Sequence, residues 1–349
     1  MNNNPFTLIF GKEPIMYINS SNQFETLKNN YLSKNPFSST YLITGVRGSG
    51  KTVLLTKISK YFEKLDDWIV VELNPETDML EYFASNLYEK MKSKIKFLKK
   101  EFSFSFNGVS FSISGDKPVS NVITLIENML DIITKKEKKI LICIDDISSN
   151  QNVKTFIQQF QIFIRHDYPL FLLMTGLYEN VRSLQNEKSL TFLYRAPQIS
   201  IGALSLISIS DSFEKALSVK KEDAILMSKM TNGYAFAYQT LGYVLYENKK
   251  TKIDDLIIEE FDRILREFVY EKVYFDLPDM EKKIVNTIAD FETAKVSDVM
   301  EILSINRESM SQYRDRLIKK GILIQKGWGN LAFALPRFRE FVTLQKEFY

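Results

Sequence analysis

Short apolar runs alternate with helical periodicity from the N-terminus to residue 204. Five of these runs are rich in β-branched or aromatic residues, as buried strands are, and they cover residues 41–44, 68–73, 140–144, 170–175 and 198–202. Between the runs, apolar residues recur every three or four positions, which is the spacing of one helix face. Strands that alternate with helices predict an α/β core built on a five-stranded parallel sheet.

The pattern changes at residues 205 and 276. Residues 205–275 show helical periodicity without strand-like runs, which predicts an all-α lid. Residues 276–349 contain three predicted helices and then two apolar runs that flank a turn at residues 327–330. Three helices followed by a β-hairpin predict a winged helix-turn-helix. The predicted domains are therefore a core at 1–204, a lid at 205–275 and a winged helix at 276–349.

A hairpin interrupts the predicted core. Between residues 102 and 113, large apolar residues alternate with serine on both sides of Asn107-Gly108. An Asn-Gly pair between two alternating runs is a strong signal for a β-hairpin. The apolar face of this hairpin needs a cover, which we expect from the core or from another subunit.

A glycine-rich loop follows the first predicted strand. Residues 45–52 read GVRGSGKT and fit the phosphate-binding pattern G-x-x-x-x-G-K-[ST] without a mismatch. Because a helix follows, backbone N–H groups and the helix N-terminus can surround a phosphate. We expect Lys51 to bind the β- and γ-phosphates and the Thr52 hydroxyl to ligate Mg²⁺. A glycine-rich turn without a ligand is the alternative, and the flanking elements argue against it. The predicted nucleotide-binding residues are Gly45, Val46, Arg47, Gly48, Ser49, Gly50, Lys51, Thr52 and Val53.

Two carboxylates follow the predicted strand at 140–144. In open parallel sheets ligands bind at the carboxyl ends of the strands, so Asp145 is the predicted Mg²⁺ ligand. Asp146 is predicted to orient or deprotonate the attacking water. Thr175 ends the next strand and is predicted to hold the γ-phosphate or the water; a plain strand-end threonine is the alternative. Arg195 is a candidate sensor of the γ-phosphate, within the chain or from a neighbouring subunit; a plain surface arginine is the alternative.

The third helix of the predicted winged helix carries several basic residues. Between residues 280 and 349 there are 12 Lys and Arg residues against 9 Asp and Glu residues, a modest excess of positive charge. We therefore predict DNA binding, and a winged helix used for packing or protein contact is the alternative. The candidate DNA-binding residues are Arg307, Ser309, Gln312, Arg314, Arg316 and Trp328.

Composition narrows the class of protein. The chain has 349 residues and a formal net charge of +3, which permits nucleic acid binding without requiring it. Cys143 and His166 are the single cysteine and histidine, so an intrachain disulfide is excluded and structural zinc is not expected. No apolar run approaches the ~20 residues of a membrane-spanning helix, and the N-terminus lacks the features of a secretory signal. We expect a cytoplasmic protein without a membrane partner.

These motifs resemble, in their order, those of AAA+ and STAND P-loop ATPases. The order is GVRGSGKT, ICIDD, LLMTG and FLYRAPQISIGALS, followed by the lid and the winged helix. The resemblance is closest to archaeal-type ATP-binding proteins related to origin-recognition initiators, and it covers nearly the whole chain. It implies ATP and Mg²⁺ as cofactors. The functional residues that it implies are Lys51, Thr52, Asp145, Asp146 and Thr175.

Several positions depart from the pattern of that family, among them the segment Asn19-Ser20-Ser21-Asn22 near the N-terminus, where the family has an Asn-Arg-Glu-type box. Asp146 stands where many AAA+ enzymes have glutamate, and the shorter side chain indicates slow, switch-like hydrolysis. Ala235 stands where the Gly-x-Pro element of the lid has proline. The resulting hypothesis is a slow ATPase whose nucleotide state controls its binding to double-stranded DNA. A STAND-like signalling ATPase that forms homo-oligomers is one alternative, and a nucleotide binder that does not hydrolyse ATP is another.

Overall fold

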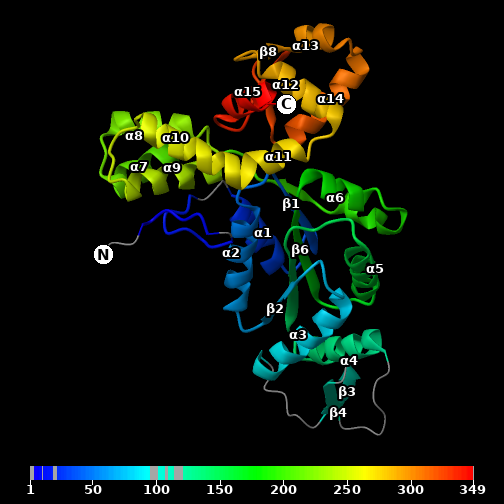
Figure 1. Ribbon diagram of the computed structural model, residues 1–349. Coiled ribbons are helices and arrows are strands. Elements are labelled where there is room, and N and C mark those ends of the chain that lie inside the picture. The colour runs from blue at the N-terminus through cyan, green and yellow to red at the C-terminus, as the bar shows by residue number, and fades with distance from the viewer. Residues whose placement is uncertain are drawn as a thin grey trace. The chain divides into compact units, whose positions relative to one another are not determined.

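The computed structural model describes residues 4–9, 11–18, 22–94, 101–106, 109–113 and 121–348 (Figure 1). The chain folds as two compact units, and each is described separately. The first, called the core unit below, consists of Phe24–Thr44 and Leu54–Ile199. The second, called the lid unit, consists of Met1–Gln23, Gly45–Val53 and Ser200–Tyr349.

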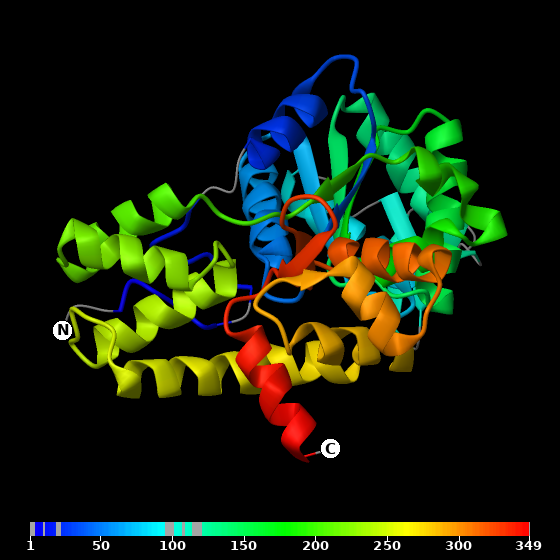
Figure 2. The same cartoon turned by 90° about the horizontal axis from the view of Figure 1, so that it is seen from above.

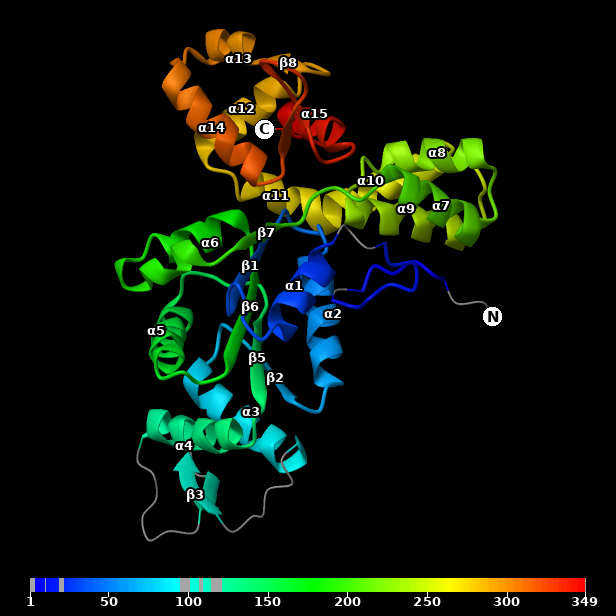
Figure 3. The same cartoon turned by 180° about the vertical axis from the view of Figure 1, so that it is seen from behind.

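A five-stranded parallel sheet, as predicted, forms the centre of the core unit (Figure 3). Its strands are β1 (Thr40–Thr44), β2 (Trp68–Leu73), β5 (Lys139–Ile144), β6 (Leu170–Gly176) and β7 (Gln198–Ser200), in the order β2-β5-β6-β1-β7. The register pairs Thr44 with Gly176 and Ile144 with Met174. The carboxyl ends of β1, β5 and β6 therefore meet at the same edge of the sheet.

Helices cover both faces of this sheet. They are α1 (Gln23–Leu32), α2 (Lys51–Glu63), α3 (Met79–Lys94), α4 (Val122–Lys135), α5 (Gln151–Arg165), α6 (Tyr178–Gln185) and the 3₁₀ helix η1 (Lys188–Arg195). On one face, the ring of Tyr31 from α1 packs against Tyr41 of β1 and Phe62 of α2. On the other, Ile142 and Leu172 belong to a buried cluster with residues of α3, α4, α5 and α6. Burial on both faces explains why these strands are continuous apolar runs.

The predicted hairpin is present in the core unit. β3 (Glu101–Phe106) and β4 (Val109–Ile113) pair in antiparallel fashion, with Phe104 opposite Phe111. This pairing confirms the hairpin, whereas its Asn107-Gly108 turn lies outside the described residues.

The lid is helical, as predicted. Its elements are α7 (Leu206–Leu217), α8 (Lys221–Met230), α9 (Ala235–Glu247), α10 (Asp255–Leu265), the π-helix η2 (Arg266–Tyr270) and α11 (Glu271–Phe275). The last three follow one another without a break and form the long yellow helix of Figure 2. Periodicity predicted one helix here but gave no sign of its π-helical turn. None of the described helices is long and apolar enough to cross a membrane.

The C-terminal segment, residues 276–348, combines helices with a small antiparallel sheet. Its elements are α12 (Asp279–Ile288), β8 (Ala294–Lys295), α13 (Val296–Leu303), α14 (Arg307–Lys319), β9 (Leu323–Gln325), β10 (Asn330–Phe333) and α15 (Phe338–Phe348). Strand β10 pairs with both β8 and β9. The three predicted helices correspond to α12, α13 and α14, whereas α15 was not predicted. The winged-helix assignment stays a prediction.

One hydrophobic core joins the parts of the lid unit. Phe6 lies in this core, with its ring beside Phe213 and Tyr238. At the other end, the Tyr270 ring of η2 lies 5.0 Å from the Phe338 ring of α15. The N-terminal residues, the lid and the C-terminal segment are therefore packed together, although the periodicity of the sequence changes between them.

Candidate nucleotide-binding site

The phosphate loop, residues 45–52, directly follows β1 and leads into α2. Gly48 and Gly50 have φ angles of 74° and 99°, which residues other than glycine rarely adopt. At Gly45 space is limited, because a Cβ there would lie 3.3 Å from the Cβ of Ile201 and the Ser49 hydroxyl would also have to turn away. The backbone conformation at Gly48 and Gly50 and the limited space at Gly45 therefore favour glycine at these three positions.

Lys51 is the first residue of α2 and is buried. Its Nζ donates hydrogen bonds to the carbonyl oxygens of Gly45 and Val46, both at 3.0 Å. The loop itself thus holds the ammonium, which adds a positive charge beside the start of the helix. A positive charge and a helix N-terminus are the two features that bind phosphate in loops of this kind.

Ser49 adds a second feature that fits a ligand. Its side chain is buried, and its Oγ has no hydrogen-bond partner among the residues that the structure describes. A buried hydroxyl without a partner costs free energy, so a phosphate oxygen beside it would stabilise the loop. The loop residues therefore fit the phosphates of a nucleotide.

The predicted carboxylates lie in the core unit, at the end of β5. Asp145 Oδ1 accepts a hydrogen bond from the hydroxyl of Thr175, the penultimate residue of β6. The same hydroxyl accepts a hydrogen bond of 3.1 Å from the backbone N–H of Asp146. The Asp146 backbone is left-handed, with a φ of 50°. The structure thus joins the Thr175 hydroxyl to the Asp145 carboxylate and to the Asp146 backbone.

Thr175 holds the Asp145 carboxylate and the Asp146 backbone in place. It is completely buried, and its hydroxyl serves as donor to one aspartate and as acceptor from the next. Asp145 is half-buried and Asp146 is exposed. This pattern suits a metal ligand of fixed orientation next to a carboxylate that reaches water. A direct contact of Thr175 with a γ-phosphate stays a prediction.

Mg²⁺ suits the oxygen donors that the two motifs supply. The Thr52 hydroxyl and the Asp145 carboxylate are hard ligands, which Mg²⁺ prefers. Within the described ranges no three His, Cys, Asp or Glu side chains are grouped as a metal site made only of protein would need. Mg²⁺ is commonly bound by one or two protein ligands together with phosphate oxygens and water. The chemistry of each side chain suits this ion, and their joint role stays a prediction. Arg195, the candidate sensor, is exposed at the end of η1.

The candidate DNA-binding residues of α14 differ in their surroundings. Arg307 and Gln312 are exposed, whereas Ser309 and Arg314 are half-buried. Arg316 is engaged within the lid unit, because its Nη1 lies 3.7 Å from the buried carboxylate of Glu281.

Neighbouring residues modify the charge of α14 further. Lys319 pairs with Asp315 at 2.8 Å, so its charge is partly neutralised on the helix itself. Trp328 is 95 % exposed between β9 and β10. Of the predicted set, Arg307, Gln312 and Trp328 are therefore the side chains presented to solvent.

The sequence did not predict that Tyr234 and Gly321 contact the phosphate loop. In the lid, Tyr234 Oη donates to the carbonyl of Arg47 at 2.5 Å. In the C-terminal segment, Gly321 lies so close that a Cβ there would be 3.1 Å from the Cβ of Val46. Gly233, before Tyr234, was a weak signal for the first contact. The glycine that ends α14 was the only signal for the second.

A phosphate loop after β1 and acidic residues after β5, in a parallel sheet of this order, define a P-loop ATPase core. Residues 27–170 match the model of a family described as an ATPase domain predominantly from Archaea. Residues 267–342 match a domain of unknown function. No curated protein matches the sequence.

Two solved structures of archaeal proteins share the fold. The first is a Walker-type ATPase of Pyrococcus abyssi, with a TM-score of 0.65 and 13% identity over 94% of this chain and 96% of that one. The second is the ORC2 protein of Aeropyrum pernix in ADPNP–ADP complexes, with a TM-score of 0.54 and 12% identity over 94% of this chain and 95% of that one. At this identity the similarity shows a shared fold and nothing more.

Proposed function

We propose that this protein is a slow ATPase that acts as a molecular switch, with its C-terminal segment as a DNA-binding winged helix. The observation that carries the proposal is the contact between Val46 of the phosphate loop and Gly321 after α14. A Cβ on Gly321 would lie 3.1 Å from Val46 Cβ and 3.7 Å from Val46 N. A loop that binds phosphate thus touches the end of the helix predicted to bind DNA.

In the proposed hydrolysis of ATP, the phosphate loop and the two aspartates have different roles. Backbone N–H groups of the loop and the Lys51 ammonium bind the phosphates, and Thr52 and Asp145 hold Mg²⁺. When bound, Mg²⁺ supplies positive charge to the β- and γ-phosphates. Asp146 orients the attacking water and accepts its proton, and Thr175 keeps the Asp145 carboxylate and the Asp146 backbone in place. Aspartate is one methylene shorter than the glutamate of many AAA+ enzymes, which supports slow hydrolysis.

The relatives support the choice of ligand. The Aeropyrum pernix ORC2 structure contains ADPNP and ADP, and the Pyrococcus abyssi protein is named as a Walker-type ATPase. An adenine nucleotide is therefore the ligand that we assign to this chain.

The contact at Val46 supports a switch because a ligand shifts a conformational equilibrium only through contacts that differ between two states. Gly321 has a φ of 73°, so this turn is a defined end of α14. A phosphate that reshapes the loop at Val46 changes the surface on which Gly321 rests. The position of α14, with exposed Arg307 and Gln312, then depends on the nucleotide.

Duplex DNA binding at about 50 mM salt, measured by fluorescence anisotropy with ATP or ADP present, tests this function, since phosphate contacts weaken steeply with salt. We expect salt-dependent binding whose affinity differs between the nucleotides. Combined Arg307→Ala and Arg314→Ala should weaken it. The control with the same loss of charge, Lys250→Ala with Lys272→Ala, removes two exposed lid lysines and should leave it unchanged. Absence of binding in both nucleotide states would refute the DNA-binding part.

A second candidate function is self-association controlled by ATP, with the C-terminal segment as a packing module. It is favoured by the ion pairs of Arg316 with Glu281 and of Lys319 with Asp315, which partly neutralise the positive charge of α14. Sedimentation velocity with and without ATP separates the two candidates. A mass that rises with ATP, in a protein that does not bind DNA, supports the second.

A further inference from the structure

The lid holds two successive carbonyl groups of the phosphate loop from outside. Tyr234 Oη donates to the carbonyl oxygen of Arg47 at 2.5 Å. The backbone N–H of Phe236, in the first turn of α9, donates to the carbonyl oxygen of Gly48 at 3.2 Å. Tyr234 is 6 % exposed, and burial raises the pKa of its hydroxyl well above the usual value. The hydroxyl therefore remains a protonated donor at neutral pH.

The lack of a side chain at Gly48 is explained by these lid contacts as well as by the loop. A Cβ on Gly48 would lie 2.3 Å from Tyr234 Oη and 2.9 Å from Phe236 Cβ, closer than real Cβ contacts. The lid and the loop fit each other tightly at this glycine. The phosphate-binding pattern fixes Gly45 and Gly50 but leaves residue 48 open, so the positive φ of Gly48 and its packing against the lid are what favour glycine there.

The Arg47 carbonyl determines where the next amide points. In a trans peptide the N–H lies opposite to the C=O, so holding the Arg47 carbonyl aims the Gly48 N–H away from Tyr234. The following amide, that of Ser49, donates to the Val46 carbonyl within the loop at 3.2 Å. The Gly48 N–H is therefore the amide whose direction Tyr234 controls. Inward-pointing amides of this kind bind phosphate in such loops.

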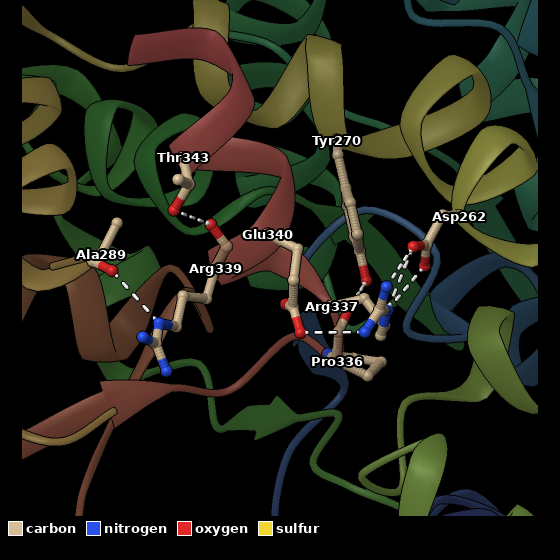
Figure 4. A network of polar contacts seen from close by, with 8 residues as sticks. All are labelled: Asp262, Tyr270, Ala289, Pro336, Arg337, Arg339, Glu340 and Thr343. Atoms are coloured by element: carbon tan, nitrogen blue, oxygen red, sulfur yellow. Dashed lines mark hydrogen bonds and ion pairs between the residues drawn. The ribbon is translucent and has the colours of Figure 1, made fainter. Parts of the chain in front are cut away.

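The support behind Tyr234 extends to the C-terminal segment. The Phe236 ring lies 6.3 Å from the Phe268 ring of η2. Tyr270, on the same π-helical turn, donates a hydrogen bond to the carbonyl of Pro336 (Figure 4). π-Helical turns are rare and are frequent at functional sites. Tyr234 and Phe236 therefore rest on an element that contacts α15.

We propose that Tyr234 is a positioning residue, through which the lid keeps the phosphate loop in its phosphate-binding form. This proposal rests on the proposed nucleotide binding and adds the residue that controls affinity from outside the site. The lid and the nucleotide then stabilise each other, because both favour the same loop conformation, and such coupling is reciprocal. Displacement of the lid withdraws the Tyr234 hydroxyl from Arg47 and releases the nucleotide.

Tyr234→Phe removes the hydroxyl and keeps the ring, and it tests this role. The control is Tyr274→Phe, which removes a hydroxyl that donates to Asn286 Oδ1 in the same unit. The dissociation constant and dissociation rate of a fluorescent ADP analogue are measured for both variants and for the wild type. We expect roughly two- to tenfold weaker binding and faster release for Tyr234→Phe, as the loss of one hydrogen bond predicts, and no change for Tyr274→Phe.

Hydrogen exchange without nucleotide provides the second readout. Amides in residues 45–52 should exchange faster in Tyr234→Phe than in the wild type, while the midpoint of thermal unfolding changes no more than in Tyr274→Phe. If the wild type does not bind the analogue, the proposed function is refuted and the positioning role with it. If the wild type binds and Tyr234→Phe binds equally, only the positioning role is overturned. The positioning role is also overturned if Tyr234→Phe binds the analogue more weakly but its midpoint of thermal unfolding falls well below that of Tyr274→Phe.

Discussion

Arg337 forms an ion pair with Asp262, to which two nitrogens of its guanidinium group donate hydrogen bonds (Figure 4). Its Nε donates to Asp262 Oδ1 at 2.8 Å and to Oδ2 at 3.1 Å, and a terminal nitrogen also donates to Oδ2. Asp262 belongs to α10 of the lid, and Arg337 precedes α15 with a left-handed backbone φ of 60°. This forked pair fixes the C-terminal segment on the lid, next to the hydrogen bond between Tyr270 and Pro336.

Asp262→Ala should lower the free energy of unfolding of the lid unit by about 1–2 kcal/mol, because a forked, charge-assisted pair is lost but remains partly hydrated. Urea unfolding followed by tryptophan and tyrosine fluorescence measures the loss. Glu340→Ala removes only the more exposed 3.0 Å partner of the same arginine and should cost less than about 0.5 kcal/mol. Equal effects of the two variants would contradict the dominance of Asp262.

Thr175→Val should lower the rate of ATP hydrolysis at saturation about 10- to 100-fold, as is usual when a group that orients a metal ligand is lost. The valine has nearly the same shape but can neither donate to Asp145 nor accept from Asp146. The Mg²⁺ concentration for half-maximal rate should rise, while affinity for ADP without metal stays the same. Titrations of the ATPase rate with Mg²⁺ measure both effects.

The control for this experiment is Thr134→Val on α4. The Thr134 hydroxyl donates to the Leu130 carbonyl one turn earlier in the helix, so its loss should leave the rate unchanged. A Thr175→Val variant with wild-type rate and Mg²⁺ dependence would mean that Thr175 does not orient the Asp145 carboxylate.

Gly48→Ala should weaken nucleotide binding by about tenfold or more, since both strain at positive φ and the clash with Tyr234 act against it. Its Cβ would lie 2.3 Å from Tyr234 Oη. Gly202→Ala is the matched control, because a Cβ there meets nothing within 4 Å and its φ is not in the left-handed region. Calorimetric titration with ADP compares the two variants. Wild-type affinity in Gly48→Ala would show that the loop tolerates a displaced lid.

The parts of the fold that local patterns encode were predictable from the sequence. Strands buried on both faces are continuous apolar runs, and the phosphate loop has a fixed spacing, so β1, β5 and the loop could be located. Asp145 and Asp146 followed from the rule that ligands bind at the carboxyl ends of parallel strands. Phe338, Phe341 and Val342 have helical spacing and are buried, so a signal for α15 was present as well.

Contacts between distant residues were not predictable in this way. The hydrogen bond between Tyr234 and Arg47 joins residues 187 positions apart, and no local pattern specifies such a pairing. Likewise, the sequence of α14 shows that Arg316 is basic but not that it faces Glu281 of α12. Hydrophobic periodicity locates elements, whereas the polar partners of a side chain depend on how the elements pack.

Glu281 and Lys320 form a buried ion pair, and Lys320 directly precedes Gly321, the residue that contacts the phosphate loop. Their side chains are 1% and 9% exposed, and Lys320 Nζ lies 2.6 Å from Glu281 Oε2. Burial raises the pKa of Glu281 and lowers that of Lys320 to about 8, so each charge is costly without the other. Glu281→Gln should therefore lower the free energy of unfolding by about 3 kcal/mol, because Lys320 loses its counter-charge.

Replacing both partners should be much milder than removing one. Glu281→Leu with Lys320→Met fills the space with apolar groups and should lie within about 1 kcal/mol of the wild type in urea unfolding. Lys319→Met, which breaks the exposed pair with Asp315, is the control and should change stability by less than about 0.5 kcal/mol. Because Lys320 adjoins Gly321 at Val46, Glu281→Gln should also speed amide exchange in the phosphate loop. A single substitution no more costly than the double one would mean that the pair contributes no electrostatic stabilisation.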